Sequence, residues 1–196
     1  MTTHAMRIYD ASGARLYLSA AERDAFKKAA DNGPRLVRTL CLTLLYTGCR
    51  ISEALELTGD RVDFQDKTLR FRSLKKRKVD GKPPAIFRAV PIPDWLLDML
   101  DLVHAIREKK YKGRLWPWKR RQAFDHVKAV MKAANIAGPQ ASPKGLRHGY
   151  GIWCQERHVP PGMIQKWMGH AQLSTTAIYT NASGGEEREI AQRLWH

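Results

Sequence analysis

The chain has few cysteines, no long apolar run and a shortage of acidic residues. Its three cysteines, Cys41, Cys49 and Cys154, lie far apart without metal-ligand spacing, so we expect them to be reduced and buried, with no metal site. No segment approaches the roughly 18 apolar residues of a membrane span. The first residues also lack the apolar core of a signal peptide. The sequence therefore predicts a cytoplasmic protein that makes no contact with a membrane.

The shortage of acidic residues gives the chain a strong positive charge. Lysine and arginine number 34 against 19 aspartates and glutamates, for a formal net charge of +15. A field of that sign favours a polyanion as partner, and nucleic acid is the first candidate. A basic solubilising surface is the alternative. Hydrophobic residues make up 43% of the chain, which excludes bulk disorder and is enough for one core.

Hydrophobic periodicity predicts a mainly α protein with a small antiparallel β-sheet or hairpin, in the α+β class. Residues 1–18 show no sustained periodicity and are expected to form an N-terminal extension. Ser19 and Glu22 then form a capping-box pattern at the start of a helix that continues to about Ala30. Further helices are predicted at 35–47, 51–55, 94–110, 121–137, 146–157, 161–168, 174–179 and 186–195. Strand-like alternation on both sides of a basic run predicts a β-hairpin with a long basic tip at 61–92.

Three separate segments carry the residues with chemical interest. They are TGCRISEALEL at 47–57, SPKGLRHGYG at 142–151 and IQKWMGHAQLSTTAIYT at 164–180. Together they closely resemble the signature of the tyrosine recombinase (phage integrase) family, in residue order and in spacing. The resemblance covers about residues 17–195. It implies the family's catalytic-domain fold over 19–183 and the cutting and rejoining of DNA strands through a 3′-phosphotyrosine intermediate, with no metal or nucleotide cofactor.

Phosphoryl transfer gives a physical reason for the arginines in these segments. Its transition state places negative charge on phosphate oxygens, which bidentate guanidinium groups stabilise where water is excluded. Arg50 and Arg147 suit that role, because each lies in an otherwise apolar stretch where an unpaired arginine would be costly. Each could instead be a structural arginine paired with a carboxylate such as Glu53. The resemblance favours catalysis, with Glu53 orienting an arginine.

The resemblance implies that Tyr179 is the nucleophile. Without this motif, a single tyrosine is more often a core residue. His170 is expected to hydrogen-bond the scissile phosphate and to help remove the phenolic proton, and His148 to support the site. At position 144, where most relatives have histidine, this sequence has Lys144. A lysine there donates to a phosphate oxygen but is a poor base at neutral pH.

The leaving 5′ oxygen needs a proton, and the resemblance assigns that step to a lysine on the hairpin tip. We expect Lys75 in this role, with Lys76 as the alternative. A solvated basic turn that contacts only the DNA backbone fits Arg77, Lys78, Lys82 and Arg88 equally well. A second basic segment begins a helix whose dipole also favours phosphate. The expected DNA-binding residues are Lys76, Arg77, Lys78, Lys119, Arg120, Arg121 and Gln122.

The expected partners are double-stranded DNA, in the nucleoid, and further copies of the chain in a tetramer on DNA. The family resemblance implies that the tail helix at 184–196 docks on a neighbouring copy; packing on its own domain is the alternative. Relatives carry a separate N-terminal helical domain, and nothing before Ser19 is expected to fold into one. Either the chain is a piece of a longer protein, or it resembles the naturally short fimbrial phase-variation invertases. A regulator that has lost catalysis and a type IB topoisomerase are the competing functions.

Overall fold

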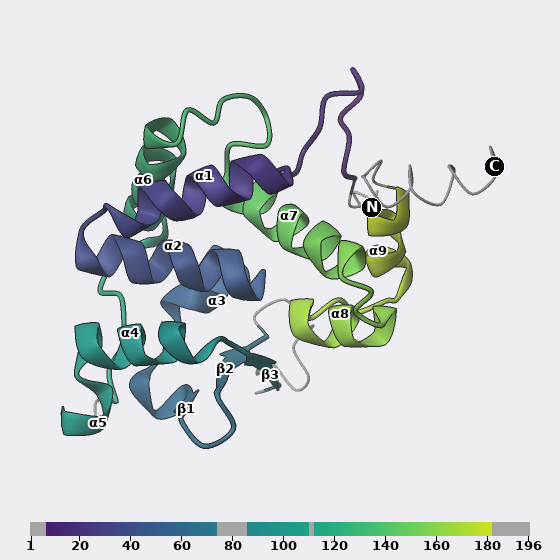
Figure 1. Ribbon diagram of the computed structural model, residues 1–196. Helices are drawn as coiled ribbons and strands as arrows, with labels where there is room; N and C mark the ends of the chain where they lie inside the picture. The colour runs from purple at the N-terminus through teal and green to yellow at the C-terminus, as the bar shows by residue number, and fades with distance from the viewer. Residues whose placement is uncertain (1–6, 74–85, 110–111, 182–196) are drawn as a thin grey trace.

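Helices packed around α2 (Arg35–Thr47) make up most of the structure, with a small sheet on one side (Figure 1). The computed structural model describes residues 7–73, 86–109 and 112–181. Helix α2 contacts α1, α4 and α7, so it is the centre of the helical layer. Nine of its thirteen residues are buried. The predicted class, mainly α with a small antiparallel sheet, is confirmed.

Local signals near the start of the chain explain the first three helices. Helix α1 (Ala20–Asp31) begins at the predicted capping box, in which the Ser19 backbone N–H donates to the Glu22 carboxylate at 2.8 Å. Helix α2 ends at Gly48, whose φ of 58° lies in the left-handed region that favours glycine. The chain then turns directly into α3 (Ile51–Leu55).

The predicted hairpin is present and belongs to a three-stranded antiparallel sheet. A 3₁₀ turn, η1 (Gly59–Arg61), leads into β1 (Val62–Asp63), which pairs with β2 (Thr68–Arg72), and β2 pairs with β3 (Phe87–Pro91). In this register Phe71 lies opposite Arg88. Leu69, Phe71 and Val90 are buried, so one face of the sheet belongs to the core.

Several helix boundaries differ from the sequence prediction. Helix α6 (Arg120–Ala133) ends before the expected residue 137, and the helix expected at 174–179 ends at Ala177 and continues as a 3₁₀ turn. The helix expected at 94–110 is divided into α4 (Asp94–His104) and α5 (Ile106–Lys109), because Ala105 is left-handed with φ 49° and Asp101 accepts from the Arg107 N–H. Helix α7 (Pro143–Glu156) begins earlier than expected, because Ser142 caps it and a proline occupies its first position. The other elements are α6 (Arg120–Ala133), α8 (Pro161–Met168), α9 (Ser174–Ala177) and the 3₁₀ turn η2 (Ile178–Asn181).

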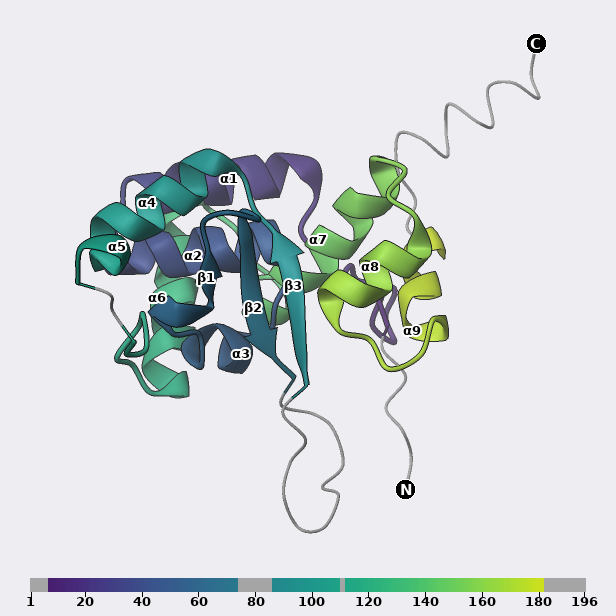
Figure 2. The same cartoon turned by 90° about the horizontal axis from the view of Figure 1, so that it is seen from below.

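Buried side chains form two clusters, and α7 passes from one to the other. The larger cluster contains the buried faces of α1 to α4, α6 and the sheet, and it reaches α7 at Leu146. The smaller one joins α7, from Tyr150 onward, to α8 and η2. Ile8 and Tyr17, from the stretch expected to be an extension, are buried in this smaller cluster. Figure 2 shows β3 at the boundary, with α8 and α9 on one side and the larger part on the other.

Candidate active site

The three chemically interesting segments converge at the boundary between the two clusters. They contribute the turn between α2 and α3, the middle of α7, and the stretch from the end of α8 to η2. The Arg147 side chain alone contacts two of them, because it donates to the Gly48 carbonyl at 2.6 Å and to the Met168 carbonyl at 2.7 Å. Residues separated by about a hundred positions in sequence therefore surround one guanidinium group.

Arg147 is held by backbone carbonyls rather than by a carboxylate. It is 4% exposed, and both carbonyls that it binds lie at helix C-termini, where the helix dipole is negative. Burial, followed by the positive charge of Arg50, lowers the pKa of Arg147 to about 10, so it remains charged at neutral pH. Because Arg147 forms no ion pair with a carboxylate in the described part of the chain, it keeps a net attraction for an anion.

Glu53 is the carboxylate at the centre of the site, and two arginines share it. It is 1% exposed. Its Oε1 accepts from Arg50 Nη1 at 2.8 Å, and its Oε2 accepts from Arg88 Nη2 at 2.6 Å and from the Arg50 backbone N–H at 2.9 Å. Burial raises the pKa of Glu53, but the charges and hydrogen bonds of Arg88 and Arg50 outweigh burial and leave it below its ordinary value.

The position of Arg88 contradicts one interpretation of the sequence. A solvated basic turn is wrong for this residue, because Arg88 is on β3 and is 7% exposed, with its guanidinium bound to Glu53 and to the Trp167 carbonyl. Its side chain points to the buried face of the sheet, over the ring of Phe71. The alternation of FRAVP places Arg88 on the same face as Val90, and that was the available signal.

The site carries more positive than negative charge and more donors than acceptors. Among the residues that the structure describes, Glu53 is the carboxylate that pairs with Arg50 and Arg88, and Arg147 has no carboxylate partner. Seven buried side-chain polar atoms lack a hydrogen-bond partner within the described part of the chain, and four of them are in this site. Buried polar groups are normally satisfied, so this concentration indicates an anion-binding site. The four atoms are Arg88 Nη1, Arg147 Nε, His148 Nε2 and His170 Nε2.

Two buried histidines have their rings near the ring of Tyr179. The ring of His170 is nearly parallel to the Tyr179 ring, with centroids 6.1 Å apart, and its Nδ1 is 2.9 Å from the Thr176 hydroxyl. The Tyr179 hydroxyl is 3.5 Å from His148 Nδ1, at the outer limit of a hydrogen bond. Burial is the main reason that the pKa of each imidazole falls to about 3, so both are neutral at pH 7.

Tyr179 is 1% exposed and packs tightly against α7. Burial raises the pKa of its phenol, while the positive charges of Arg147 and Arg50 act in the opposite direction. The arrangement has the parts needed for attack of a phenol on a phosphate: a hydroxyl, neighbouring imidazoles and preorganised cations.

The contact between Tyr179 and Gly151 gives a first prediction. A Cβ at Gly151 would lie 2.4 Å from Tyr179 Cε2, so Gly151→Ala must displace the phenol ring without removing any polar group. If Tyr179 attacks a DNA phosphate, as the sequence predicts, we expect this attack to slow by about 100-fold, the cost of a displacement near 1 Å. Gly162→Ala on α8 is the matched control, because no atom lies within 4 Å of its Cβ. Equal rates of adduct formation in the two variants would contradict the placement of the ring.

Of the remaining predicted residues, Lys144 lies near the site and four others lie on the surface at the start of α6. Lys144 is exposed in the first turn of α7, and its charge contributes to the lowered pKa of His148, so it lies near the site. Lys119, Arg120, Arg121 and Gln122 are exposed at the start of α6, where the Gln122 side chain accepts from the Lys119 backbone N–H at 2.9 Å. Arg121 pairs with Asp125. Lys75, Lys76, Arg77, Lys78 and Lys82, like the tail at 184–196, lie outside the described residues.

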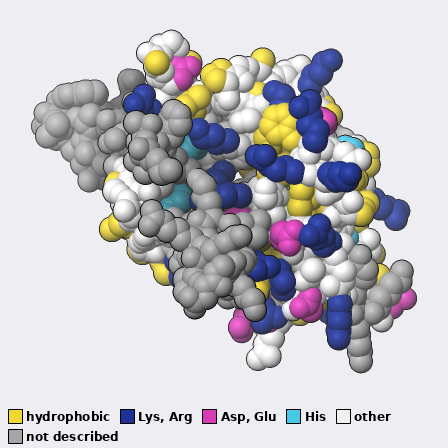
Figure 3. Space-filling view, turned by 180° about the vertical axis from the view of Figure 1, so that it is seen from behind, with side chains coloured by type: hydrophobic (Ala, Val, Ile, Leu, Met, Phe, Trp, Pro, Cys, Tyr) yellow, Lys and Arg dark blue, Asp and Glu magenta, His cyan; other side chains and the backbone are white. Residues whose placement is uncertain are grey.

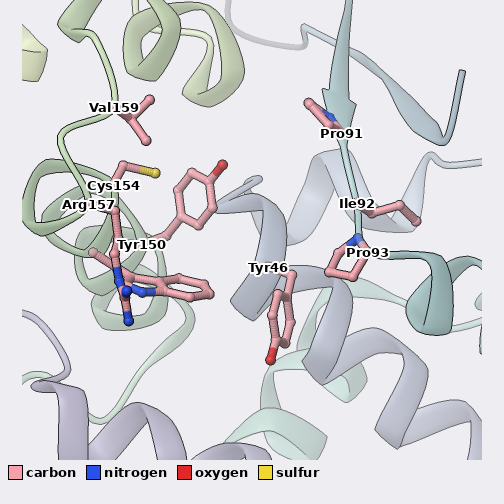
Figure 4. Close-up of a pocket in the computed structure, with 9 residues that line it drawn as sticks. Tyr46, Pro91, Ile92, Pro93, Tyr150, Cys154, Arg157 and Val159 are labelled. Carbon is pink, nitrogen blue, oxygen red and sulfur yellow. The ribbon is translucent and has the colours of Figure 1, made fainter.

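One face of the molecule carries many basic side chains. Figure 3 shows lysine and arginine side chains over much of the rear face, with histidine near its middle. A cavity of about 280 Å³ lies elsewhere, between the start of α4 and the second half of α7 (Figure 4). It is lined by Tyr46, Pro91, Ile92, Pro93, Tyr150, Trp153, Cys154, Arg157 and Val159, none of which was predicted as a site residue.

Comparisons with known proteins agree with this geometry. The model of the phage integrase family matches residues 17–185, and the chain belongs to this family of tyrosine recombinases. It is 28% identical over 173 residues to the type 1 fimbriae regulatory protein FimB of Escherichia coli K12, covering 87% of this chain and 86% of FimB. It is 32% identical over 177 residues to tyrosine recombinase XerA of Pyrococcus horikoshii, covering 87% of this chain and 59% of XerA.

Solved structures show the same fold. The site-specific recombinase XerH, crystallised in a post-cleavage complex with a palindromic difH substrate, superposes with a TM-score of 0.74 at 18% identity. The match covers all of this chain and 58% of the XerH chain. The chain therefore spans about three fifths of XerA and XerH but most of FimB. Among the described residues, no helix is both long enough and apolar enough to cross a bilayer.

Two residues with contacts in the site were not predicted as site residues from the sequence. Arg88 was assigned to the exposed turn, and Thr176, which binds the His170 ring, was not selected. Thr176 is 2% exposed and lies three residues before Tyr179, and this helical spacing was the signal that the sequence offered. The three cysteines are free and buried, as predicted.

Proposed function

We propose that this protein is a site-specific DNA recombinase that cleaves and rejoins DNA strands through a 3′-phosphotyrosine on Tyr179. One observation carries the proposal: a buried, net positive site in which four polar atoms lack a partner among the described residues and in which the Tyr179 hydroxyl lies beside His148. A phosphodiester supplies acceptors for these atoms and an electrophile for the phenol. Family membership supports the same reaction.

In the proposed cleavage, the Tyr179 oxygen forms a bond to the scissile phosphorus while the bond to the 5′ oxygen breaks. Arg50 and Arg147 stabilise the charge on the non-bridging oxygens, and His170 Nε2 donates a further hydrogen bond. His148 is the imidazole nearest the hydroxyl and accepts the phenolic proton, a role first expected of His170. The phosphate's negative charge raises the pKa of His148, which lets it take the proton. The 5′ oxygen leaves with a proton from Lys75, by family resemblance.

The reverse reaction rejoins the strands. The phosphotyrosine bond is a phosphodiester of similar energy to the DNA bond that it replaces, so the religation step needs no nucleotide cofactor. When the attacking 5′ hydroxyl belongs to another duplex, strands are exchanged. Recombination therefore requires two sites held together, which is why we propose a tetramer on DNA.

The direct test traps the intermediate. The substrates are overlapping nicked duplexes that together cover the DNA flanking the gene. Cleavage beside the nick releases a short fragment that carries the 5′ hydroxyl. Because this fragment is lost, religation is prevented and the covalent product accumulates. The proposal predicts an adduct that survives SDS on a subset of these duplexes, followed by recombination between two marked copies of the site. Absence of any adduct would indicate a DNA-binding regulator, and an adduct with DNA relaxation but no recombination would indicate a topoisomerase.

We propose that the basic face binds the DNA backbone, with the start of α6 as one contact. If Lys119, Arg120 and Arg121 each contact a phosphate, their joint replacement by alanine lowers the slope of log K against log salt concentration by about 2 to 3. Fluorescence anisotropy with a labelled duplex at several salt concentrations measures this slope. Lys28→Ala is the control, because it removes one exposed basic side chain on α1, outside the segment that is tested. A slope unchanged in the triple variant would exclude this segment from the interface.

We further propose that the unit 19–183 performs the chemistry and that the tail at 184–196 joins neighbouring copies. A chain ending at Ser183 is then expected to bind one duplex but to lose the tetramer. Sedimentation velocity with DNA measures this difference directly. Tetramers of the shortened chain at the same concentration would favour packing of the tail on its own domain.

A further inference from the structure

Arg88 occupies a position where three segments of the site meet. From β3, its Nη2 donates to Glu53 on α3 at 2.6 Å, and its Nε donates to the Trp167 carbonyl on α8 at 2.8 Å. A Cβ at Gly169 would lie 3.1 Å from the guanidinium, so the chain passes as close as a glycine allows. This guanidinium is therefore fixed from two sides in the interior of the site.

Arg88 and Arg50 bind different oxygens of the Glu53 carboxylate, so its negative charge interacts with both. Arg50 is bound to Oε1 and Arg88 to Oε2 of the same carboxylate. In the absence of Arg88, Glu53 would interact with Arg50 alone at 2.8 Å, and their opposite charges would largely cancel in a poorly solvated place. Arg88 thus leaves more of the Arg50 charge available for a phosphate.

Arg88 also holds the segment that leads to His170. It binds the Trp167 carbonyl, while Arg147 binds the next carbonyl, that of Met168. Helix α8 therefore ends against two arginines of the site, and His170 follows two residues later. Arg88 connects the position of this histidine to the position of Glu53.

We propose that Arg88 is a positioning residue for DNA cleavage, which keeps Glu53 from neutralising Arg50 and fixes the end of α8 beside the scissile phosphate. This role rests on the proposed function. Nη1 of this buried group has no partner among the residues described, so the two contacts that fix the guanidinium do not use all of its donors.

The test compares Arg88→Met and Arg88→Lys with Arg107→Met, a change at an exposed arginine on α5 that pairs with Asp101. Single-turnover cleavage of the nicked duplex that forms an adduct is measured at saturating protein, and the affinity for that duplex separately. We expect Arg88→Met to cleave about 100-fold more slowly with little change in affinity, Arg88→Lys to recover about 10-fold, and the control to match the parent chain. Equal cleavage rates in Arg88→Met and the parent would overturn the proposal.

A second change separates charge sharing from simple packing. Glutamine at position 53 can still cap α3 through its side-chain oxygen but carries no charge. If Glu53 neutralises Arg50 once Arg88 is gone, adding Glu53→Gln to Arg88→Met raises the cleavage rate. A further fall in rate would show that Arg88 contributes packing alone, against the proposal.

A third readout does not depend on cleavage. The Glu53 carboxyl is surrounded by Arg50 and Cys49 from the turn before α3, Arg88 from β3 and Arg147 from α7. Carbon-13 NMR of this carboxyl without DNA is expected to show a higher titration midpoint in Arg88→Lys and Arg88→Met than in the parent chain. An unchanged midpoint would overturn charge sharing. If the parent chain forms no adduct, the proposed function fails, while this titration still decides the role of Arg88.

Discussion

Tyr179→Phe is expected to abolish the SDS-resistant protein–DNA adduct, with a loss of at least about 1,000-fold. The substitution removes one oxygen, which is the atom that forms the bond to phosphorus in the proposed reaction. Because the ring is packed against α7 and is 1% exposed, phenylalanine fills the same space. Adduct yield on the nicked duplex, measured by gel electrophoresis in SDS, gives the comparison.

Tyr17→Phe is the matched control for this change. Tyr17 is also buried, in the same small cluster, and its hydroxyl is 3.4 Å from the hydroxyl of Tyr9. Removal of this oxygen is expected to leave the adduct yield unchanged. Binding of the intact duplex should also be unchanged in Tyr179→Phe, which separates a loss of chemistry from a loss of affinity. An adduct that persists in Tyr179→Phe would assign the nucleophile to another residue.

Arg147 gives the second large effect. Arg147→Lys retains a positive charge but cannot span the Gly48 and Met168 carbonyls, which the guanidinium bridges at 2.6 and 2.7 Å. We expect single-turnover cleavage to fall by about 100- to 1,000-fold, the usual cost of losing a preorganised donor to transition-state charge. A carbonyl left without its donor also destabilises the fold by about 1–3 kcal/mol.

Thermal unfolding separates the two consequences of Arg147→Lys. Cleavage is measured well below the unfolding midpoint of the variant, so that all of the protein is folded. Arg23→Lys serves as the control, because Arg23 is likewise buried and donates to a helix carbonyl, that of Gly149, but is bound to Glu156 away from Tyr179. A variant at position 147 that cleaves as fast as this control would exclude Arg147 from transition-state stabilisation.

The sequence predicted the helices well where local signals were strong. The capping box at Ser19 and Glu22 and the glycine after Thr47 mark helix ends by the chemistry of a few neighbouring residues. The break at Ala105 was not predictable in this way, because alanine is a good helix former and rarely adopts positive φ. It depends on the Asp101 carboxylate, which binds the Arg107 N–H and side chain.

For the site, motif spacing identified residues but not their contacts. Family spacing selected Arg50, Arg147 and Tyr179, and the structure brings their segments together. Spacing alone does not reveal that β3 contributes Arg88, since a strand and a basic turn are adjacent in sequence and the face is decided by tertiary packing. Nor does it show which imidazole is nearer the phenol, which depends on how η2 packs against α7.

The most direct test of the account is to identify the residue that carries the DNA. The trapped adduct is digested with nuclease and protease, and mass spectrometry locates the peptide that retains a 3′-linked nucleotide. The account predicts the nucleotide on Tyr179, in a fragment that also contains Thr176. A nucleotide on any other residue would contradict the claim that Arg50, Arg147 and the two histidines hold a phosphate beside the Tyr179 hydroxyl.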